Sequence, residues 1–317
     1  MPRIRIYDRT KGLPNPAKWI MQLNMRASTN LIDSLLNDLA PVVAGRTGTS
    51  GISTSVPRVT VWTSTVTTLP TPAVFEPMFY AVIQGTKLLI MGANRFELEA
   101  GACAASSFGL PFLHQFTVAT SALPYVAISL HLDTTLLTNV ILSMPKREDR
   151  WSCAVAAGDL SGPAGEAFAR LVGLMKTPDD IGVLGPHYES ELYYRLLQST
   201  MGDTLRQIGQ RKKRFQQLKT SADWLASNYS EPVDIRHLAS SAGMSVTSFH
   251  RHFKKVTGFS PLAFQRHIRL LEARKLLAGG LANVSRVAYD VGYVSPSQFS
   301  REYKSMFGIP PVADLQR

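Results

Sequence analysis

The chain has 317 residues, of which 45% are hydrophobic, and a mean hydropathy near zero. This length permits two domains, each with its own core. No apolar run approaches the ~18 residues that a membrane helix needs, and the basic N-terminus precedes no apolar segment of the secretion-signal type. The two cysteines, Cys103 and Cys153, fit no metal or redox spacing. We therefore expect a cytoplasmic chain with free thiols and no membrane partner.

The 34 basic and 23 acidic residues give a net charge of +11, which is distributed unevenly. From Arg211 to the end there are 17 basic and 7 acidic residues, so nearly all of the excess lies in the last third. A neutral body that carries a basic C-terminal third is typical of a polyanion-binding module attached to a separate domain.

The first motif along the chain is a pair of arginines, Arg5 and Arg9. Their R-x-x-x-R spacing resembles the arginines with which PilZ domains grasp dinucleotides. The companion D-x-S-x-x-G motif is absent, because DLSGPAG, from Asp159, has one residue too many. A solvated basic tail is the favoured interpretation, and an anionic cyclic dinucleotide is the alternative.

Short strands are predicted between about Arg58 and Leu132. RVTVWTST alternates, and FYAVIQGTKLLIMGANRFELEAGACAASS divides into strands at Gly and Asn turns. Six to eight strands at roughly ten-residue spacing indicate a small barrel or sandwich, which either fills its interior with side chains or holds one small molecule. Each polar or aromatic strand residue, taken singly, is more often a core or surface residue, and together they form the candidate effector site: Tyr80, Gln84, Lys87, His114, Gln115, Tyr125 and His131.

An enzymatic barrel is disfavoured by its histidines. Catalytic barrels of this kind hold a metal with clustered His and a carboxylate, beginning from an HxH pair. The barrel segment offers only His114 and His131, seventeen residues apart, and the chain has no G-x-S-x-G elbow. The sequence therefore predicts no catalytic residues, no metal and no cofactor. From about Pro163 to Gln210, helical patterns follow the barrel.

A duplicated pattern fills the C-terminal third. GMSVTSFHRHFKKVTGFSP begins at Gly243, and GYVSPSQFSREYKSMFGIPP begins at Gly292. In each copy a short helix, capped by Asp234 or Asn283, leads through a glycine turn into a second helix with a buried aromatic stripe and a basic outer face. This is the helix-turn-helix unit, whose second helix fits the DNA major groove. PLAFQRHIRLLEARKLLAGG is predicted to be the helix that joins the two units. An αα-repeat scaffold with no DNA role is the alternative.

These segments resemble the DNA-binding domain of the AraC family of bacterial transcription regulators. The likeness runs from LASSAGMSVTSFHRHFKKVTGFSPLAFQRHIRLLEARKLL through VAYDVGYVSPSQFSREYKSMFGIPP, about a third of the chain. The resemblance places six residues over base edges: Thr247, His250, Arg251, Ser297, Gln298 and Arg301. It places five more at phosphates: Ser245, Lys254, Lys255, Ser295 and Lys304. Pro296 departs from the family pattern, because many members carry a polar reader there.

The strand segment resembles, less specifically, the cupin-like effector domain found ahead of the DNA-binding half in one branch of the same family. We therefore expect an α+β protein with three parts: a cupin-like β-barrel over 1–162, linking and dimerisation helices over 163–210, and an all-α DNA-binding domain with two helix-turn-helix units over 211–317. The implied partners are double-stranded promoter DNA, a small-molecule effector, a second copy of the chain and, for an activator, RNA polymerase. A basic nucleic-acid-binding protein without a role in transcription is the remaining alternative.

Overall fold

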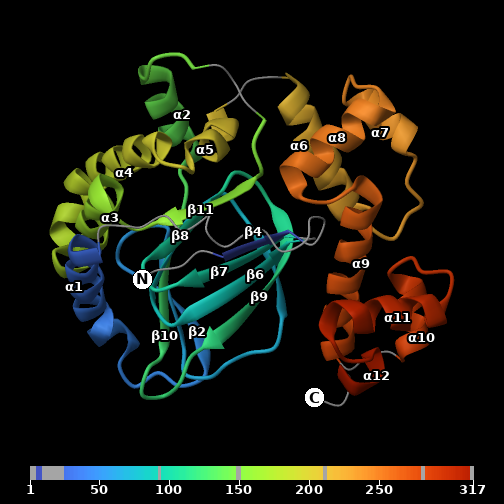
Figure 1. Ribbon diagram of the computed structural model, residues 1–317, viewed down its shortest axis with the longest axis horizontal. Coiled ribbons are helices and arrows are strands. Elements are labelled where there is room, and N and C mark those ends of the chain that lie inside the picture. The colour runs from blue at the N-terminus through green and yellow to red at the C-terminus, as the bar shows by residue number, and fades with distance from the viewer. Residues whose placement is uncertain are drawn as a thin grey trace. The chain divides into compact units, whose positions relative to one another are not determined.

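The computed structural model describes residues 5–8, 25–91, 94–147, 151–209, 213–279 and 283–314 (Figure 1). The chain divides into two compact units, Met1–Gln210 and Arg211–Arg317. The first unit combines β-sheets with helices and the second is helical, as the sequence predicts. The described strands of the first unit form two separate sheets and not the closed barrel that was expected.

The described strands of the first unit form two antiparallel sheets. The five-stranded sheet has the order β1-β7-β6-β9-β4, and the six-stranded sheet has the order β11-β8-β5-β10-β3-β2. The strands are β1 (Arg5–Asp8), β2 (Thr49–Ser53), β3 (Val59–Ser64), β4 (Thr71–Phe75), β5 (Met78–Gln84), β6 (Thr86–Met91), β7 (Asn94–Glu99), β8 (Ala102–Ser106), β9 (Leu110–Val118), β10 (Tyr125–His131) and β11 (Val155–Asp159).

Helices cover one face of the six-stranded sheet (Figure 1). They are α1 (Met25–Val43), α2 (Thr134–Ser143), α3 (Gly162–Gly173), α4 (Ile181–Gln198) and α5 (Gly202–Gly209), with short 3-10 turns η2 (Leu174–Lys176) and η3 (Pro178–Asp180) between α3 and α4. α1, α2 and β11 were not identified from the sequence within 1–162.

The central strands β5 and β10 are buried on both faces, which explains why their sequences are nearly continuous apolar runs. Alternate residues pack against the helices, as Phe79 does against the ring of Phe168 at 5.1 Å between centroids. The residues between them, such as Tyr80 and Tyr125, face away from the helices and are also buried. The six-stranded sheet therefore has a second layer of buried side chains, on the face opposite the helices.

The second unit consists of α6 (Lys213–Ser227), α7 (Ile235–Ser241), α8 (Val246–Thr257), α9 (Pro261–Ala278), α10 (Val284–Asp290), α11 (Pro296–Phe307) and α12 (Pro311–Asp314). The long helix α9 contacts α6 and α8 on one side of the duplication and α10, α11 and α12 on the other. It buries apolar side chains such as Phe264, Leu271 and Leu277 along its length. The predicted joining helix is therefore confirmed as the central core element of this unit.

Candidate nucleic-acid interface and interior polar site

The first helix-turn-helix unit forms as its capping residues predict. Asp234 accepts hydrogen bonds from the backbone N–H groups of Arg236 and His237, and so begins α7. Gly243 adopts a left-handed conformation (φ +63°), which lets the chain turn sharply into α8. The hydroxyl of Ser245 then accepts from the N–H of Ser248 at 3.3 Å and caps α8.

The second helix-turn-helix unit repeats these features. Asn283 caps α10 through the N–H of Arg286, Gly292 turns with φ +88°, and Ser295 caps α11 through the N–H of Gln298. Both second helices end in a left-handed glycine, Gly258 or Gly308. Matched caps at each end fix the position of α8 and α11 in their units.

The two turns differ in length by one residue. After the left-handed glycine, Met244 immediately precedes the N-cap Ser245, whereas both Tyr293 and Val294 precede Ser295. Tyr293 is buried against Phe299, and the additional residue, Val294, is 90% exposed. The second helix-turn-helix unit therefore presents an apolar side chain beside the start of α11.

The outer faces of α8 and α11 carry the side chains that the sequence assigned to DNA. Among the predicted base readers, Thr247, Arg251, Ser297, Gln298 and Arg301 are exposed and His250 is half-buried. Among the predicted phosphate contacts, Ser245, Lys254, Lys255 and Lys304 are exposed and Ser295 is half-buried. The opposite face of each helix is buried through Phe249 and Phe253 or Phe299 and Tyr303, as predicted.

A carboxylate on α11 organises part of this face. Glu302 accepts hydrogen bonds from the Tyr293 hydroxyl at 2.7 Å and from the Gln298 amide at 3.1 Å, and lies 3.7 Å from the guanidinium of Arg266. Burial and the contact with Glu302 raise the pKa of Tyr293. Glu302 therefore links Gln298 to Tyr293 and Arg266. In the first helix-turn-helix unit His252 occupies the position of Glu302, so α8 and α11 differ in charge at this point.

One arginine joins the two halves of the duplication. The Arg269 guanidinium, on α9, donates to the backbone carbonyl of Tyr229 at 2.6 Å, before α7, and to that of Gly292 at 2.7 Å, in the second turn. Gln265, one turn earlier, donates to the carbonyls of Tyr229 and Glu231. Because carbonyl acceptors leave no mark in the sequence, this clamp was not predicted. The clamp connects the loop ahead of the first helix-turn-helix unit directly to the turn of the second helix-turn-helix unit.

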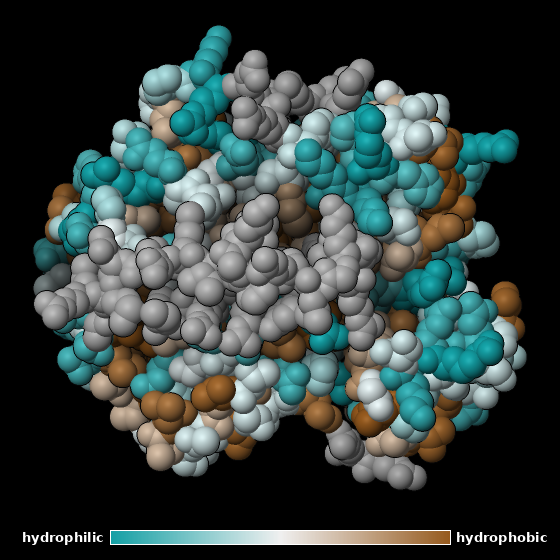
Figure 2. All heavy atoms as spheres, in the orientation of Figure 1, coloured by the Kyte–Doolittle hydropathy of each residue, from teal (hydrophilic) through white to brown (hydrophobic). Residues whose placement is uncertain are grey.

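The surface of the C-terminal unit, Arg211–Arg317, carries both hydrophilic and hydrophobic side chains. Hydrophilic residues cover much of the part of this unit that Figure 2 draws, and separate hydrophobic side chains lie between them. The exposed hydrophobic residues of the unit include Val246, Leu262, Tyr289 and Val294.

In the N-terminal unit, Met1–Gln210, four of the predicted effector residues lie together inside the sheets. The Lys87 ammonium, on β6, donates to the Tyr80 hydroxyl at 3.0 Å, and the hydroxyls of Tyr80 and Tyr125 are 2.7 Å apart. Lys87 is 7% exposed, and burial lowers its pKa to about 7. His114, on β9, is near enough to Lys87 for its charge to assist burial in lowering the histidine pKa to about 3.

The other predicted effector residues lie elsewhere. Gln84 donates to the carbonyl of Pro124 at the loop end of the sheets, and Gln115 alternates with His114 and so faces the other side of β9. His131, at the far end of β10 from Tyr125, pairs with Glu76 at 3.3 Å. Arg5 stands opposite Glu97 in the edge strand β1, and Arg9 lies outside the described residues.

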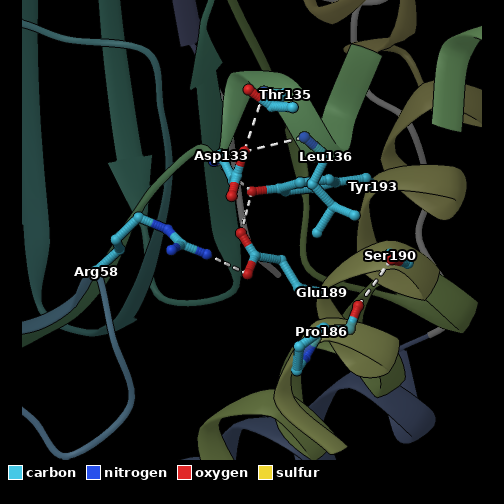
Figure 3. Close-up of polar contacts among 8 residues, drawn as sticks. All are labelled: Arg58, Asp133, Thr135, Leu136, Pro186, Glu189, Ser190 and Tyr193. Carbon is cyan, nitrogen blue, oxygen red and sulfur yellow. Dashed lines mark hydrogen bonds and ion pairs between the residues drawn. The ribbon is translucent and has the colours of Figure 1, made fainter. Parts of the chain in front are cut away.

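A second polar network joins the sheet to the helical layer (Figure 3). Arg58, whose φ of +63° is left-handed, pairs with the carboxylate of Glu189 on α4. The Tyr193 hydroxyl also donates to Glu189, and it accepts from the N–H of Asp133, whose carboxylate caps α2. This network, which the sequence did not reveal, fixes α4 against the start of β3 and the start of α2.

No described helix combines the length and the apolar character of a membrane span. In the described part of the chain, no group of three or more His, Cys, Asp or Glu residues is placed to hold a metal. Cys103 is buried and burial raises the pKa of its thiol, so the thiolate is disfavoured.

Two family models match the chain. The model for the N-terminus of AraC-type transcriptional regulators covers residues 55–204, and a helix-turn-helix model covers residues 238–317. Together with a sheet unit followed by a duplicated helix-turn-helix unit, they define the class as a two-domain transcription regulator. The chain belongs to the AraC family of transcriptional regulators. The resemblance stated from the sequence is confirmed.

Individual relatives match a smaller part of the chain. GbdR of Pseudomonas aeruginosa is 33% identical over 92 residues, which are 29% of this chain and 25% of GbdR. RhaS of Yersinia pestis is 33% identical over 89 residues, which are 28% of this chain and 33% of RhaS. The chain thus spans a quarter to a third of the length of these relatives. The structure of ToxT from Vibrio cholerae with a bound unsaturated fatty acid covers 81% of this chain and 94% of its own, with 11% identity and a TM-score of 0.49.

Proposed function

We propose that the protein is a sequence-specific DNA-binding regulator of transcription whose activity is controlled by a small-molecule effector bound in the N-terminal unit. The observation that carries the proposal is the pair of capped reading helices, α8 and α11, joined through α9 and the Arg269 clamp. Two helices held on one rigid support suit adjacent segments of the major groove.

The exposed residues of α8 and α11 divide by chemistry. Arg251 and Arg301 suit guanine, because a guanidinium donates two hydrogen bonds to its major-groove edge. Thr247, His250, Ser297 and Gln298 complete the proposed base-reading set. Ser245, Lys254, Lys255, Ser295 and Lys304 form the proposed phosphate set, which supplies affinity without sequence preference.

The remaining features of the proposal concern assembly and location. We propose a homodimer formed through the helices of 163–210, because Val183 and Tyr194 are exposed and lie about three turns apart on one side of α4. Replacing Val183 by Asp should then lower the sedimenting mass. A DNA target implies a cytoplasmic location. If the protein is an activator of transcription, it also contacts RNA polymerase. We propose no catalytic step.

Selection from a random duplex library tests the DNA-binding assignment. Because two reading helices enter successive major grooves, the enriched sites should contain two short elements about 10 base pairs apart, centre to centre. Their affinity at moderate salt should exceed that of scrambled duplex at least 1000-fold, the order of magnitude found for specific complexes. Enrichment of no sequence, or equal binding to scrambled duplex, would contradict the proposal.

A fragment that begins at residue 211 separates the roles of the two units. It keeps both reading helices and a buried core of its own, so it should bind the selected site, but more weakly than a dimer that engages two sites at once. It should show no response to an effector that changes DNA binding by the full chain. A response of equal size in the fragment would place the effector site outside the N-terminal unit.

A further inference from the structure

The interior of the N-terminal unit contains an ammonium group without a counter-charge. Lys87 is buried between the sheets, 4.1 Å from the centroid of the Tyr80 ring and 5.7 Å from that of Phe116. Within the described residues, no carboxylate pairs with it, and burial is the cause of its lowered pKa. Buried charges in proteins are otherwise paired or bound to a ligand.

The groups around Lys87 also have an excess of hydrogen-bond donors. An ammonium carries three hydrogens and each tyrosine hydroxyl carries one. Two hydrogen bonds join Lys87, Tyr80 and Tyr125, and their acceptors are the phenol oxygens. His114 adds a buried Nδ1 that has no partner among the described residues. A molecule with acceptor oxygens would satisfy these donors.

The cluster lies near one end of the sheets, where β5 turns into β6. β5 and β6 are joined at Gly85, where φ is +80° and a Cβ would lie 2.5 Å from the carbonyl oxygen of Val118, so this tight turn requires glycine. Lys87 follows two residues later, opposite Phe116. The adjoining loops, 65–70 and 119–124, and the end of β9 carry side chains that are 45–50% exposed and apolar: Val66, Leu69, Val118 and Leu123.

We propose that Lys87, Tyr80 and Tyr125 bind the carboxylate of a small organic acid whose apolar part lies toward these loops. The carboxylate accepts from the ammonium and from a tyrosine hydroxyl, and its charge pairs with Lys87. That this acid is also the effector rests on the function proposed above. Binding at the site itself does not depend on that function.

Binding should take up a proton above about pH 7. The titratable groups that face Lys87 are Tyr80 from β5, His114 from β9 and Tyr125 from β10. The pKa of each tyrosine is raised by burial, and that of His114 is lowered to about 3, so Lys87 is the group of this set that titrates between pH 6 and 9. Because the acid binds the charged ammonium, its affinity should fall about tenfold for each pH unit above 7.

Thermal unfolding of the full chain provides the test. Acetate, benzoate and octanoate are compared with acetamide, benzamide and octanamide at pH 7 and pH 9, because a bound ligand raises the midpoint. At least one acid should raise the midpoint of the wild type at pH 7, more weakly at pH 9, and its amide should not. Lys87→Met should lose this response, and the matched control Lys146→Met, which removes an exposed lysine, should keep it.

Calorimetry of the same acid in buffers of different ionisation enthalpy should show proton uptake at pH 8 by the wild type. The proposal is overturned if no acid of the panel stabilises the wild type, if Lys87→Met responds equally, or if sodium phosphate stabilises as well as the acids do.

The outcome also separates this site from the proposed regulation. An acid that binds through Lys87 without changing affinity for the selected DNA supports the site and contradicts its role as the effector site. An uncharged compound that changes DNA affinity, in a chain that binds no acid of the panel, supports regulation and overturns the carboxylate site.

Discussion

Replacing Lys87 by methionine should stabilise the protein, by an amount that depends on pH. Methionine has a similar length and fills the same space without an ammonium to desolvate. A lysine in water has a pKa of 10.5, and burial lowers that of Lys87 to about 7. The difference of about 3.5 pH units corresponds to about 5 kcal/mol, because each unit is worth about 1.4 kcal/mol.

The sign follows from the protons bound in each state. Between pH 7 and 10.5 the unfolded chain holds the Lys87 proton and the folded chain does not, so the free energy of unfolding of the wild type rises with pH. Below about pH 7 both states are protonated and the full cost applies. Lys87→Met has no such dependence. After about 1–2 kcal/mol is deducted for the lost hydrogen bond and ring contact, the variant should be ~3 kcal/mol more stable at pH 7.

Urea unfolding at pH 6, 7, 8 and 9, followed by the fluorescence to which Trp62 contributes, measures this difference. Trp62 is a suitable reporter because its indole N–H donates to Ser129 inside the sheets, 2.8 Å away. The advantage of Lys87→Met should be constant below pH 7 and fall by ~1.4 kcal/mol per unit above it. A difference that stays constant from pH 6 to 9, or a variant that is less stable throughout, would refute the assignment of a desolvated ammonium.

Three further predictions concern the contacts described above. Arg251→Ala and Arg301→Ala should each weaken binding to the selected site by about 1–3 kcal/mol, whereas Lys254→Ala should weaken selected and scrambled duplex alike and flatten the salt dependence; competition assays would show equal losses on both duplexes if the arginines did not read bases. Arg269→Lys cannot reproduce the bonds to two separate carbonyls, so affinity for a site with both elements should fall at least tenfold and affinity for one element should change little, as gel-shift titrations can measure. Glu189→Gln should lower the free energy of unfolding by about 1 kcal/mol, because Arg58 loses its charge partner at a partly exposed position; an unchanged urea midpoint would show that the network contributes no stability.

The DNA-binding unit could be predicted closely because its signals are local. Four helices are capped by side chains that accept from backbone groups two or three residues away: those of Asp234, Ser245, Asn283 and Ser295. The residues that begin each helix are therefore adjacent in the sequence, where a local pattern can identify them. The aromatic stripe of each reading helix repeats with helical spacing, and its burial follows. The duplication then shows the same local pattern twice.

The interior site and the clamp could not be derived in the same way. Tyr80 and Tyr125 are brought together by the pairing of β5 with β10, and Lys87 joins them because Gly85 turns the chain back. Among seven candidate residues, nothing in the sequence separated those that face inward from Gln115, which faces the other side of its strand. Arg269 was equally hidden, since its partners are carbonyl oxygens that every residue possesses.

The energetics of Lys87 bear on how an effector could regulate DNA binding. A ligand shifts two conformations only by the difference in its affinity for them, and reversing a ratio of 1:99 requires about 5.5 kcal/mol. The free protein retains an uncompensated ammonium that costs about 5 kcal/mol at neutral pH, from the difference between its pKa of about 7 and that of a lysine in water. A carboxylate that pairs with Lys87 removes much of this cost. A ligand of this kind therefore acts on an energy of the size that regulation needs, provided that the ammonium is desolvated in one conformation and hydrated in the other. An uncharged molecule of the same shape gains none of it, so charge rather than size should decide which compounds regulate the protein.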